Sequence, residues 1–121
     1  MRYSTPAMDR MKEAIGGDAA VLADILQSFV EEADTLAATL HREMERQSME
    51  GVGRTVHTIK SSARDFGDDE LAQLCAGVEQ EARGGAVNDL ERRGSEIAGK
   101  CLQLRDDVAA YIRTALGSAA P

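Results

Sequence analysis

Residues 52–66, VGRTVHTIKSSARDF, carry the pattern from which the fold can be predicted. On a helical wheel at about 100° per residue, the apolar side chains of this stretch gather on one side. They are Val52, Val56, Ile59, Ala63 and Phe66. This spacing is typical of a helix that buries one face against other helices. His57 lies roughly 140° from the apolar stripe, so we expect its imidazole to face solvent.

The residues around His57 on the same helix face are small or positively charged, because positions three or four residues apart are neighbours on a helix. They are Gly53, Arg54, Lys60, Ser61 and Arg64. A neutral imidazole is a competent nucleophile near neutral pH, since its unperturbed pKa is about 6.5. An exposed imidazole with small neighbours and a positive rim suits a nucleophile that meets a bulky anionic partner.

The composition limits the class of protein. The chain has 121 residues, which predicts a single domain spanning residues 1–121. It is 43% hydrophobic with only two prolines, which favours packed helices and an all-α fold. The net charge of −7 argues against general binding to nucleic acid or to anionic membranes. No apolar run approaches a membrane span and the amino end lacks a signal-peptide core, so we expect a cytoplasmic protein.

Two cysteines and a second histidine have simple structural interpretations. Cys75 and Cys101 lie on apolar stripes and lack the spacing of a redox or metal-binding motif, so we expect reduced, buried thiols. We therefore expect no metal site and no cofactor of the chain's own. His41 borders another apolar stripe among charged residues, which favours a structural role.

Hydrophobic periodicity and turn signals predict five helices. The expected helices cover residues 7–15, 18–46, 49–65, a fourth from 68 or 69 to the Gly84-Gly85 pair, and 87–116. The first five residues are expected to be frayed. Asp18 is an expected N-cap, Gly67 an expected C-terminal glycine, and Asn88 with Glu91 an expected capping box. The apolar stripe of the second helix is expected to contain Leu22, Ile25, Phe29, Ala33, Leu36, Leu40 and Met44.

Four amphipathic helices joined by short loops have one economical arrangement, an antiparallel up-down four-helix bundle. The short additional N-terminal helix would then cover one end of that bundle.

Residues 57–79 resemble the signature of histidine-containing phosphotransfer (HPt) domains. The matching segments are HTIKSSA at 57–63, Phe66-Gly67 and LAQLCAGVE at 71–79. Ser61 stands where glycine is frequent in the family, and Val78 where leucine is. The resemblance implies the same bundle fold. It also implies that His57 accepts a phosphoryl group on Nε2 from the phospho-aspartate of a receiver domain.

The resemblance also implies roles for the neighbours of His57. Lys60 would stabilise the phosphoryl group, and Glu79 could accept a hydrogen bond from Nδ1 of His57. Arg83 could cover the phosphate or simply pair with Glu79 four residues earlier. The residues expected to contact a partner are Gly53, Arg54, Ser61, Arg64 and Arg83.

The expected partners are receiver domains of response regulators or of a hybrid histidine kinase, and Mg²⁺ is expected on the receiver. The chain would act as a monomeric phosphocarrier in a two-component phosphorelay, without enzymatic turnover of its own. One alternative is a helical adaptor, a degenerate HPt domain that binds receivers without accepting phosphate. Another is the dimerisation domain of a sensor kinase, but such domains follow the histidine with an acidic residue and a later proline. This chain has Thr58 and Ser62 at those positions.

Overall fold

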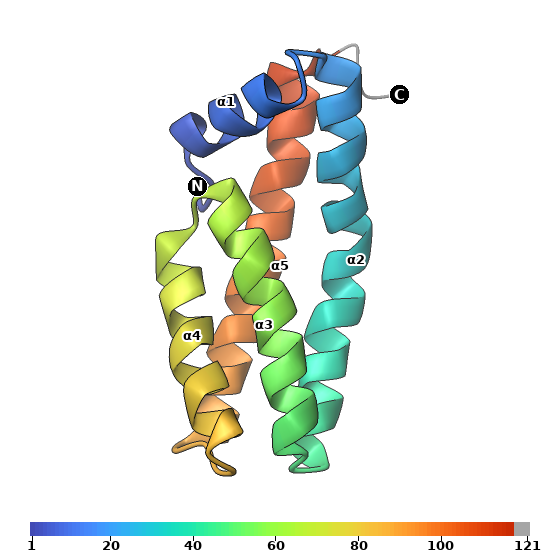
Figure 1. Ribbon diagram of the computed structural model, residues 1–121. Helices are drawn as coiled ribbons and strands as arrows, with labels where there is room; N and C mark the ends of the chain where they lie inside the picture. The colour runs from blue at the N-terminus through green and yellow to red at the C-terminus, as the bar shows by residue number, and fades with distance from the viewer. Residues whose placement is uncertain (118–121) are drawn as a thin grey trace.

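The predicted amphipathic segments are helices in the computed structural model, which describes residues 1–117 (Figure 1). Within that range there are five helices and no strand. The helices are α1 (Thr5–Ala14), α2 (Ala19–Glu45), α3 (Met49–Phe66), α4 (Asp69–Arg83) and α5 (Leu90–Ala115). The prediction of an all-helical fold is confirmed.

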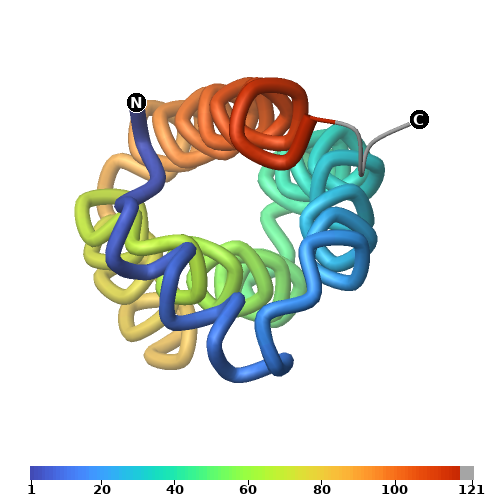
Figure 2. Tube along the Cα trace, turned by 90° about the horizontal axis from the view of Figure 1, so that it is seen from above, coloured from blue at the N-terminus to red at the C-terminus, as the bar shows by residue number. Residues whose placement is uncertain are grey.

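The four longer helices lie side by side, and α1 crosses one end of them (Figure 1). The turns from α2 to α3 and from α4 to α5 lie at the end opposite α1 (Figure 1). Seen from above in Figure 2, α2, α3, α4 and α5 surround a common centre. The most extensive contacts join α3 to α4 and α2 to α5. The pair α3 and α4 therefore forms one flank of the molecule.

The apolar stripe of α3 lies in the core, as its spacing predicts. All five of its side chains are buried, from Val52 to Phe66. Phe66 meets Phe29 of α2 in an edge-to-face contact with ring centroids 5.0 Å apart. Burial of each aliphatic side chain of this kind contributes about 1.5–3 kcal/mol. The stripe fixes the rotation of α3 about its own axis and so decides which residues face outward.

The predicted position of Ile25 in the core is wrong. The residue is 40% exposed, and Leu26 is fully buried in its place. On a helical wheel Leu26 lies about 10° from the mean direction of the buried residues of α2, whereas Ile25 lies about 90° away. Ile25 instead borders a surface hollow that it shares with Met11 of α1.

The expected capping box at the start of α5 is also wrong, and α5 begins three residues later than predicted. Asp89 occupies the N-cap position with φ of 54° and makes no side-chain cap bond. The backbone N–H of Asn88 donates to the Glu81 carboxylate of α4 at 2.9 Å, and Arg93 of α5 donates to the same carboxylate at 2.8 Å. The hydrogen bond from Arg93, and to a smaller extent that from Asn88, lowers the pKa of Glu81 to about 2. Hydrogen bonds between the start of α5 and Glu81 of α4 thus take the place of the expected capping box.

Arg2 and Ser4, in the segment expected to be frayed, are bound to residues of α4 and to the end of α3. The Arg2 guanidinium binds the buried Asp68 carboxylate at 2.7 Å and Glu70 at 2.7 Å. The backbone N–H of Ser4 donates to the carbonyl of Phe66 at 2.8 Å. Because these partners lie more than sixty residues further along the chain, local sequence patterns did not reveal them.

The two cysteines are buried and unpaired. Burial raises the pKa of the Cys75 thiol to about 12 and that of the Cys101 thiol to about 11. Both thiols are therefore protonated at neutral pH and pack as small apolar groups.

Gly67, which ends α3, provides a test of the turn that leads into α4. Its φ of 76° is in the left-handed region, and an added Cβ would lie 2.1 Å from Ser4 Oγ. Gly67→Ala should lower the free energy of unfolding by more than the roughly 1–2 kcal/mol that the left-handed backbone alone costs. Urea unfolding followed by circular dichroism measures this change.

Gly16→Ala is the matched control, because Gly16 has a similar φ of 81° with open space around it. Its free energy of unfolding should fall only by the cost of placing alanine in the left-handed region. Equal losses for the two variants would contradict the proposed crowding between Gly67 and Ser4.

Candidate functional site

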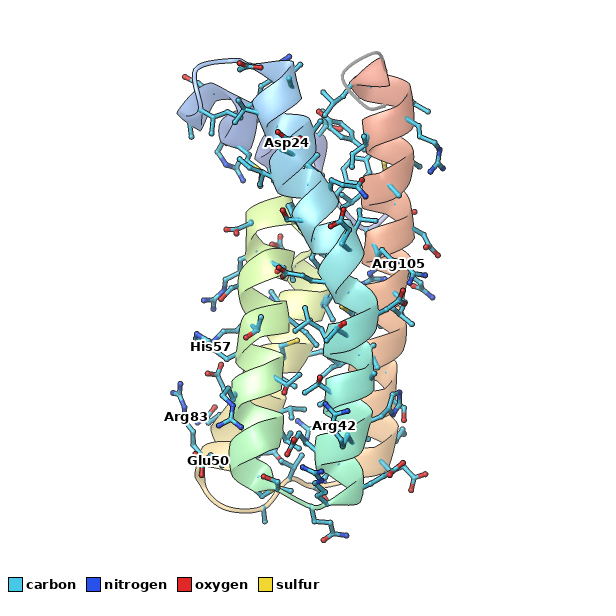
Figure 3. The ribbon with its side chains drawn as sticks, turned by 90° about the vertical axis from the view of Figure 1, so that its right-hand side faces the viewer. Asp24, Arg42, Glu50, His57, Arg83 and Arg105 are labelled. Carbon is cyan, nitrogen blue, oxygen red and sulfur yellow. The ribbon has the colours of Figure 1, made fainter. Side chains whose placement is uncertain are left out.

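His57 projects from the outer flank of the bundle (Figure 3). Its neighbours Val56 and Ile59 are buried, which turns the imidazole away from the core. The side chain of His57 is 55% exposed. The expectation that this ring faces solvent is confirmed.

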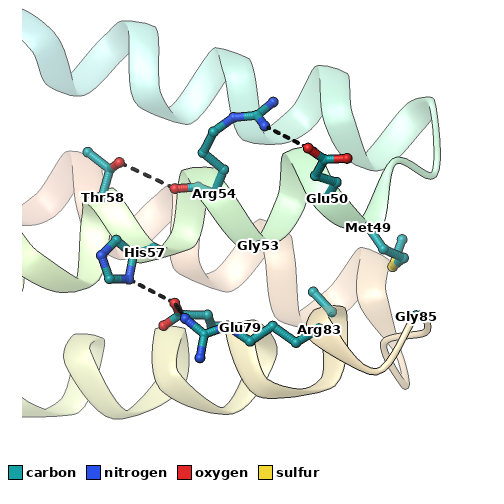
Figure 4. Close-up of a pocket in the computed structure, with 10 residues that line it drawn as sticks. Met49, Glu50, Gly53, Arg54, His57, Thr58, Glu79, Arg83 and Gly85 are labelled. Atoms are coloured by element: carbon teal, nitrogen blue, oxygen red, sulfur yellow. Dashed lines mark hydrogen bonds and ion pairs between the residues drawn. The ribbon is translucent and has the colours of Figure 1, made fainter.

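The carboxylate of Glu79, on α4, lies directly beside the imidazole (Figure 4). Its Oε2 is 2.8 Å from Nδ1 of His57, although its side chain is only 5% exposed. The residue is buried because α4 packs along α3. The hydrogen bond expected between these two side chains is therefore present.

Two cations complete the surroundings of the Glu79 carboxylate. Lys60 Nζ donates to Oε1, and Arg83 Nη2 donates to Oε2 at 2.8 Å. The Lys60 ammonium lowers the pKa of Glu79; burial opposes this effect, and the hydrogen bond from His57 reinforces it. Glu79 is therefore ionised at neutral pH. An ionised carboxylate only accepts hydrogen bonds, so Nδ1 of His57 is the donor in this bond. In the neutral form of the ring, Nε2 then holds the free lone pair.

The two cations differ in their access to the surface. The Lys60 side chain is 14% exposed, because its ammonium is directed to the buried carboxylate. The Arg83 side chain is 74% exposed. A guanidinium has five N–H donors, so Arg83 keeps further donors for a group bound at the surface.

A hollow of roughly 610 Å³ opens beside His57 between α3 and α4 (Figure 4). Its lining includes Met49, Gly53, Ala82 and Gly85, and Arg83 stands at its edge. A Cβ added at Gly53 would touch the Cβ of Ala82 at 3.4 Å, so glycine here keeps the surface between the helices low. The hollow gives a partner room to approach the ring.

The structure brings most of the predicted partner-contact residues together. Arg54 lines the same hollow and pairs with Glu50 at 3.5 Å. Ser61 is exposed, and its hydroxyl donates to the backbone carbonyl of His57 at 3.2 Å. Arg64 does not line this hollow. It borders a separate one beside Met11 of α1.

The sequence analysis did not identify five residues that line the hollow, which are Met49, Glu50, Thr58, Ala82 and Gly85. Met49 and Glu50 lie eight and seven residues before His57, so the helical spacing of α3 could have placed both on its face. No local sequence pattern predicts that Ala82 and Gly85 line the hollow, because their position depends on how α4 packs against α3. His41 lies away from this site, in a hollow near the start of α5 that includes Leu90.

One of three comparisons with known proteins gives a match. The model of the family described as "Hpt domain" matches residues 24–114, a range that contains both His57 and Glu79. Neither a search of curated proteins nor a search of solved structures gives a match. Among residues 1–117, no helix has the length and hydropathy needed to span a membrane. The chain belongs to the Hpt domain family, whose members are phosphocarriers that interact with receiver domains in two-component phosphorelays.

Proposed function

We propose that His57 is the phosphoacceptor of this chain. The supporting observation is the hydrogen bond from Nδ1 of the half-exposed ring to the ionised Glu79 carboxylate. This bond fixes the tautomer and the ring orientation, and it leaves Nε2 as the nucleophilic nitrogen of the neutral ring. Glu79 is accordingly a positioning residue for His57.

The transfer that this geometry supports is a displacement at phosphorus. The lone pair of Nε2 attacks the phosphorus of a receiver phospho-aspartate, a new N–P bond forms, and the aspartyl O–P bond breaks. A second receiver aspartate then takes the phosphoryl group by the reverse step. Such displacements depend on positioning and charge stabilisation. The Glu79 carboxylate is already bonded to three donors, so we propose that the receiver supplies the Mg²⁺.

Charge at the site favours the phosphorylated state. A phosphoryl group adds about two negative charges. Lys60 and Arg83 together carry two positive charges beside the ring, and we propose that both stabilise the bound group. Gly53, Arg54 and Ser61 would lie under the docked receiver, and Arg64 would contact its outer edge.

His57→Gln should abolish labelling by a phosphorylated receiver domain in the presence of Mg²⁺, because it removes the attacking nitrogen. The measurement is transfer of radioactive phosphate to the chain as an acid-labile, base-stable adduct. His41→Gln is the matched control and should be labelled like the wild type. Wild-type protein that binds the phosphorylated receiver but takes no label would instead support the adaptor alternative.

Ser61→Trp should slow transfer at least about tenfold while leaving helicity intact, because an indole one turn from His57 would block a docked receiver. Stopped-flow or quenched-flow transfer assays measure this rate. Ser28→Trp is the control, since Ser28 is an exposed helix serine on α2 that also donates to the carbonyl four residues earlier. Equal rates for both variants would show that receivers do not cover Ser61.

Lys60→Met should slow transfer by about 10- to 100-fold, since a hydrogen bond to a charged group contributes about 1.5–3 kcal/mol. Lys100→Met is the control, because Lys100 pairs with carboxylates on α4 and α5 away from His57. If Lys60→Met transferred phosphate as fast as Lys100→Met, the role proposed for Lys60 would be wrong.

A further inference from the structure

We infer that Glu79 keeps the proton on Nδ1 of His57 after Nε2 has been phosphorylated, and so holds the phosphohistidine in its readily donating form. The inference rests on the proposed function of His57. It assigns to the carboxylate an effect on the lifetime and pH dependence of the phosphorylated state, in addition to orienting the ring.

The proton on Nδ1 decides how good a leaving group the ring is. An imidazole that carries hydrogen on Nδ1 and phosphorus on Nε2 is a cation. When its N–P bond breaks, the bonding pair returns to Nε2 and neutral imidazole leaves. If the Nδ1 proton is lost first, the same cleavage must expel an imidazolate anion, which is a much stronger base and a poorer leaving group.

The structure places an acceptor where this proton is. Glu79 Oε2 lies 2.8 Å from Nδ1, and the bond from Lys60 to Oε1 holds the other end of the carboxylate. The carboxylate is buried, and donors from His57, Lys60 and Arg83 hold it in place. An opposite charge in such contact favours the charged form of a titrating group.

The other charged groups near the ring come from the same two helices. Arg83 of α4 faces the carboxylate, and Arg54 and Glu50 of α3 pair with each other across the rim of the hollow. None of the residues that line this hollow comes from α1, α2 or α5 within the described part of the chain. Glu79 is therefore the charge in direct contact with the ring, and Lys60 and Arg83 are the charges that hold it.

Charge balance among these groups changes when the phosphoryl group arrives. Before phosphorylation, Lys60 and Arg83 carry two positive charges and Glu79 carries one negative charge, which leaves a net charge of +1. A phosphoryl group with about two negative charges reverses the excess to one negative charge. The ring proton neutralises this excess, which is why Glu79 favours the protonated phosphohistidine. With glutamine at this position the two cations would already balance the phosphoryl group, and no excess negative charge would retain the proton.

The test compares wild-type protein with Glu79→Gln, both phosphorylated by a phosphorylated receiver and Mg²⁺. Nuclear magnetic resonance of the labelled ring nitrogens follows loss of the Nδ1 proton as the pH is raised. We expect this loss at least about one pH unit lower in Glu79→Gln, since a contacting opposite charge shifts a pKa by about 1–3 units. Donation to a receiver should decline over the same lower pH range, and the phosphohistidine should live longer at mildly alkaline pH.

Glu32→Gln is the matched control, because it removes the same charge from an exposed position on α2, where solvent and salt screen that charge. Its phosphohistidine should lose the Nδ1 proton at the same pH as that of the wild type. If Glu79→Gln fails to fold, the wild-type protein is compared with a phosphorylated peptide of residues 53–61, whose ring should lose its proton at a lower pH.

The possible outcomes separate the two proposals. Absence of phosphohistidine in the wild type would overturn the proposed function and this inference with it. A phosphohistidine that titrates at the same pH in wild type as in Glu79→Gln, or as in the peptide, would overturn this inference alone.

Discussion

The buried carboxylate of Glu79 is the constraint on which the site depends. A buried charge is costly unless it is paired and hydrogen-bonded, and removal of one partner leaves an uncompensated charge. Here three donors, from His57, Lys60 and Arg83, meet the two carboxylate oxygens. Two of them come from α3 and one from α4, so the network fixes the two helices against each other and fixes the imidazole at the same time.

The packing of the bundle makes that network possible. The apolar stripe of α3 buries Val56 and Ile59, which turns His57 and Lys60 to the flank where α4 lies. The left-handed turn at Gly67 then brings α4 back beside α3. The amino-terminal segment secures this turn from outside through Arg2 and Ser4, so structure far from His57 supports its orientation.

Much of the fold follows from local patterns, and the errors have physical causes. The buried face of α3 and the exposure of His57 were predictable, because helical spacing alone decides which side chains share a face. Ile25 was misplaced because it lies three residues after Leu22 and four before Phe29, a spacing that fits the helical period although Leu26 lies nearer the centre of the buried stripe. The capping box at Asn88 failed because contacts between α4 and α5 outweighed a local preference.

The sequence by itself determined the helices, the outward face of His57 and the motif that identifies the family, since each depends on the order of nearby residues. Only the tertiary structure decided that Lys60 and Arg83 share the Glu79 carboxylate with the ring, and that Arg64 belongs to a different hollow. The physical reason is that these relations depend on how one helix is rotated and set against another. Hydrogen-bond geometry and burial arise only once the helices have packed.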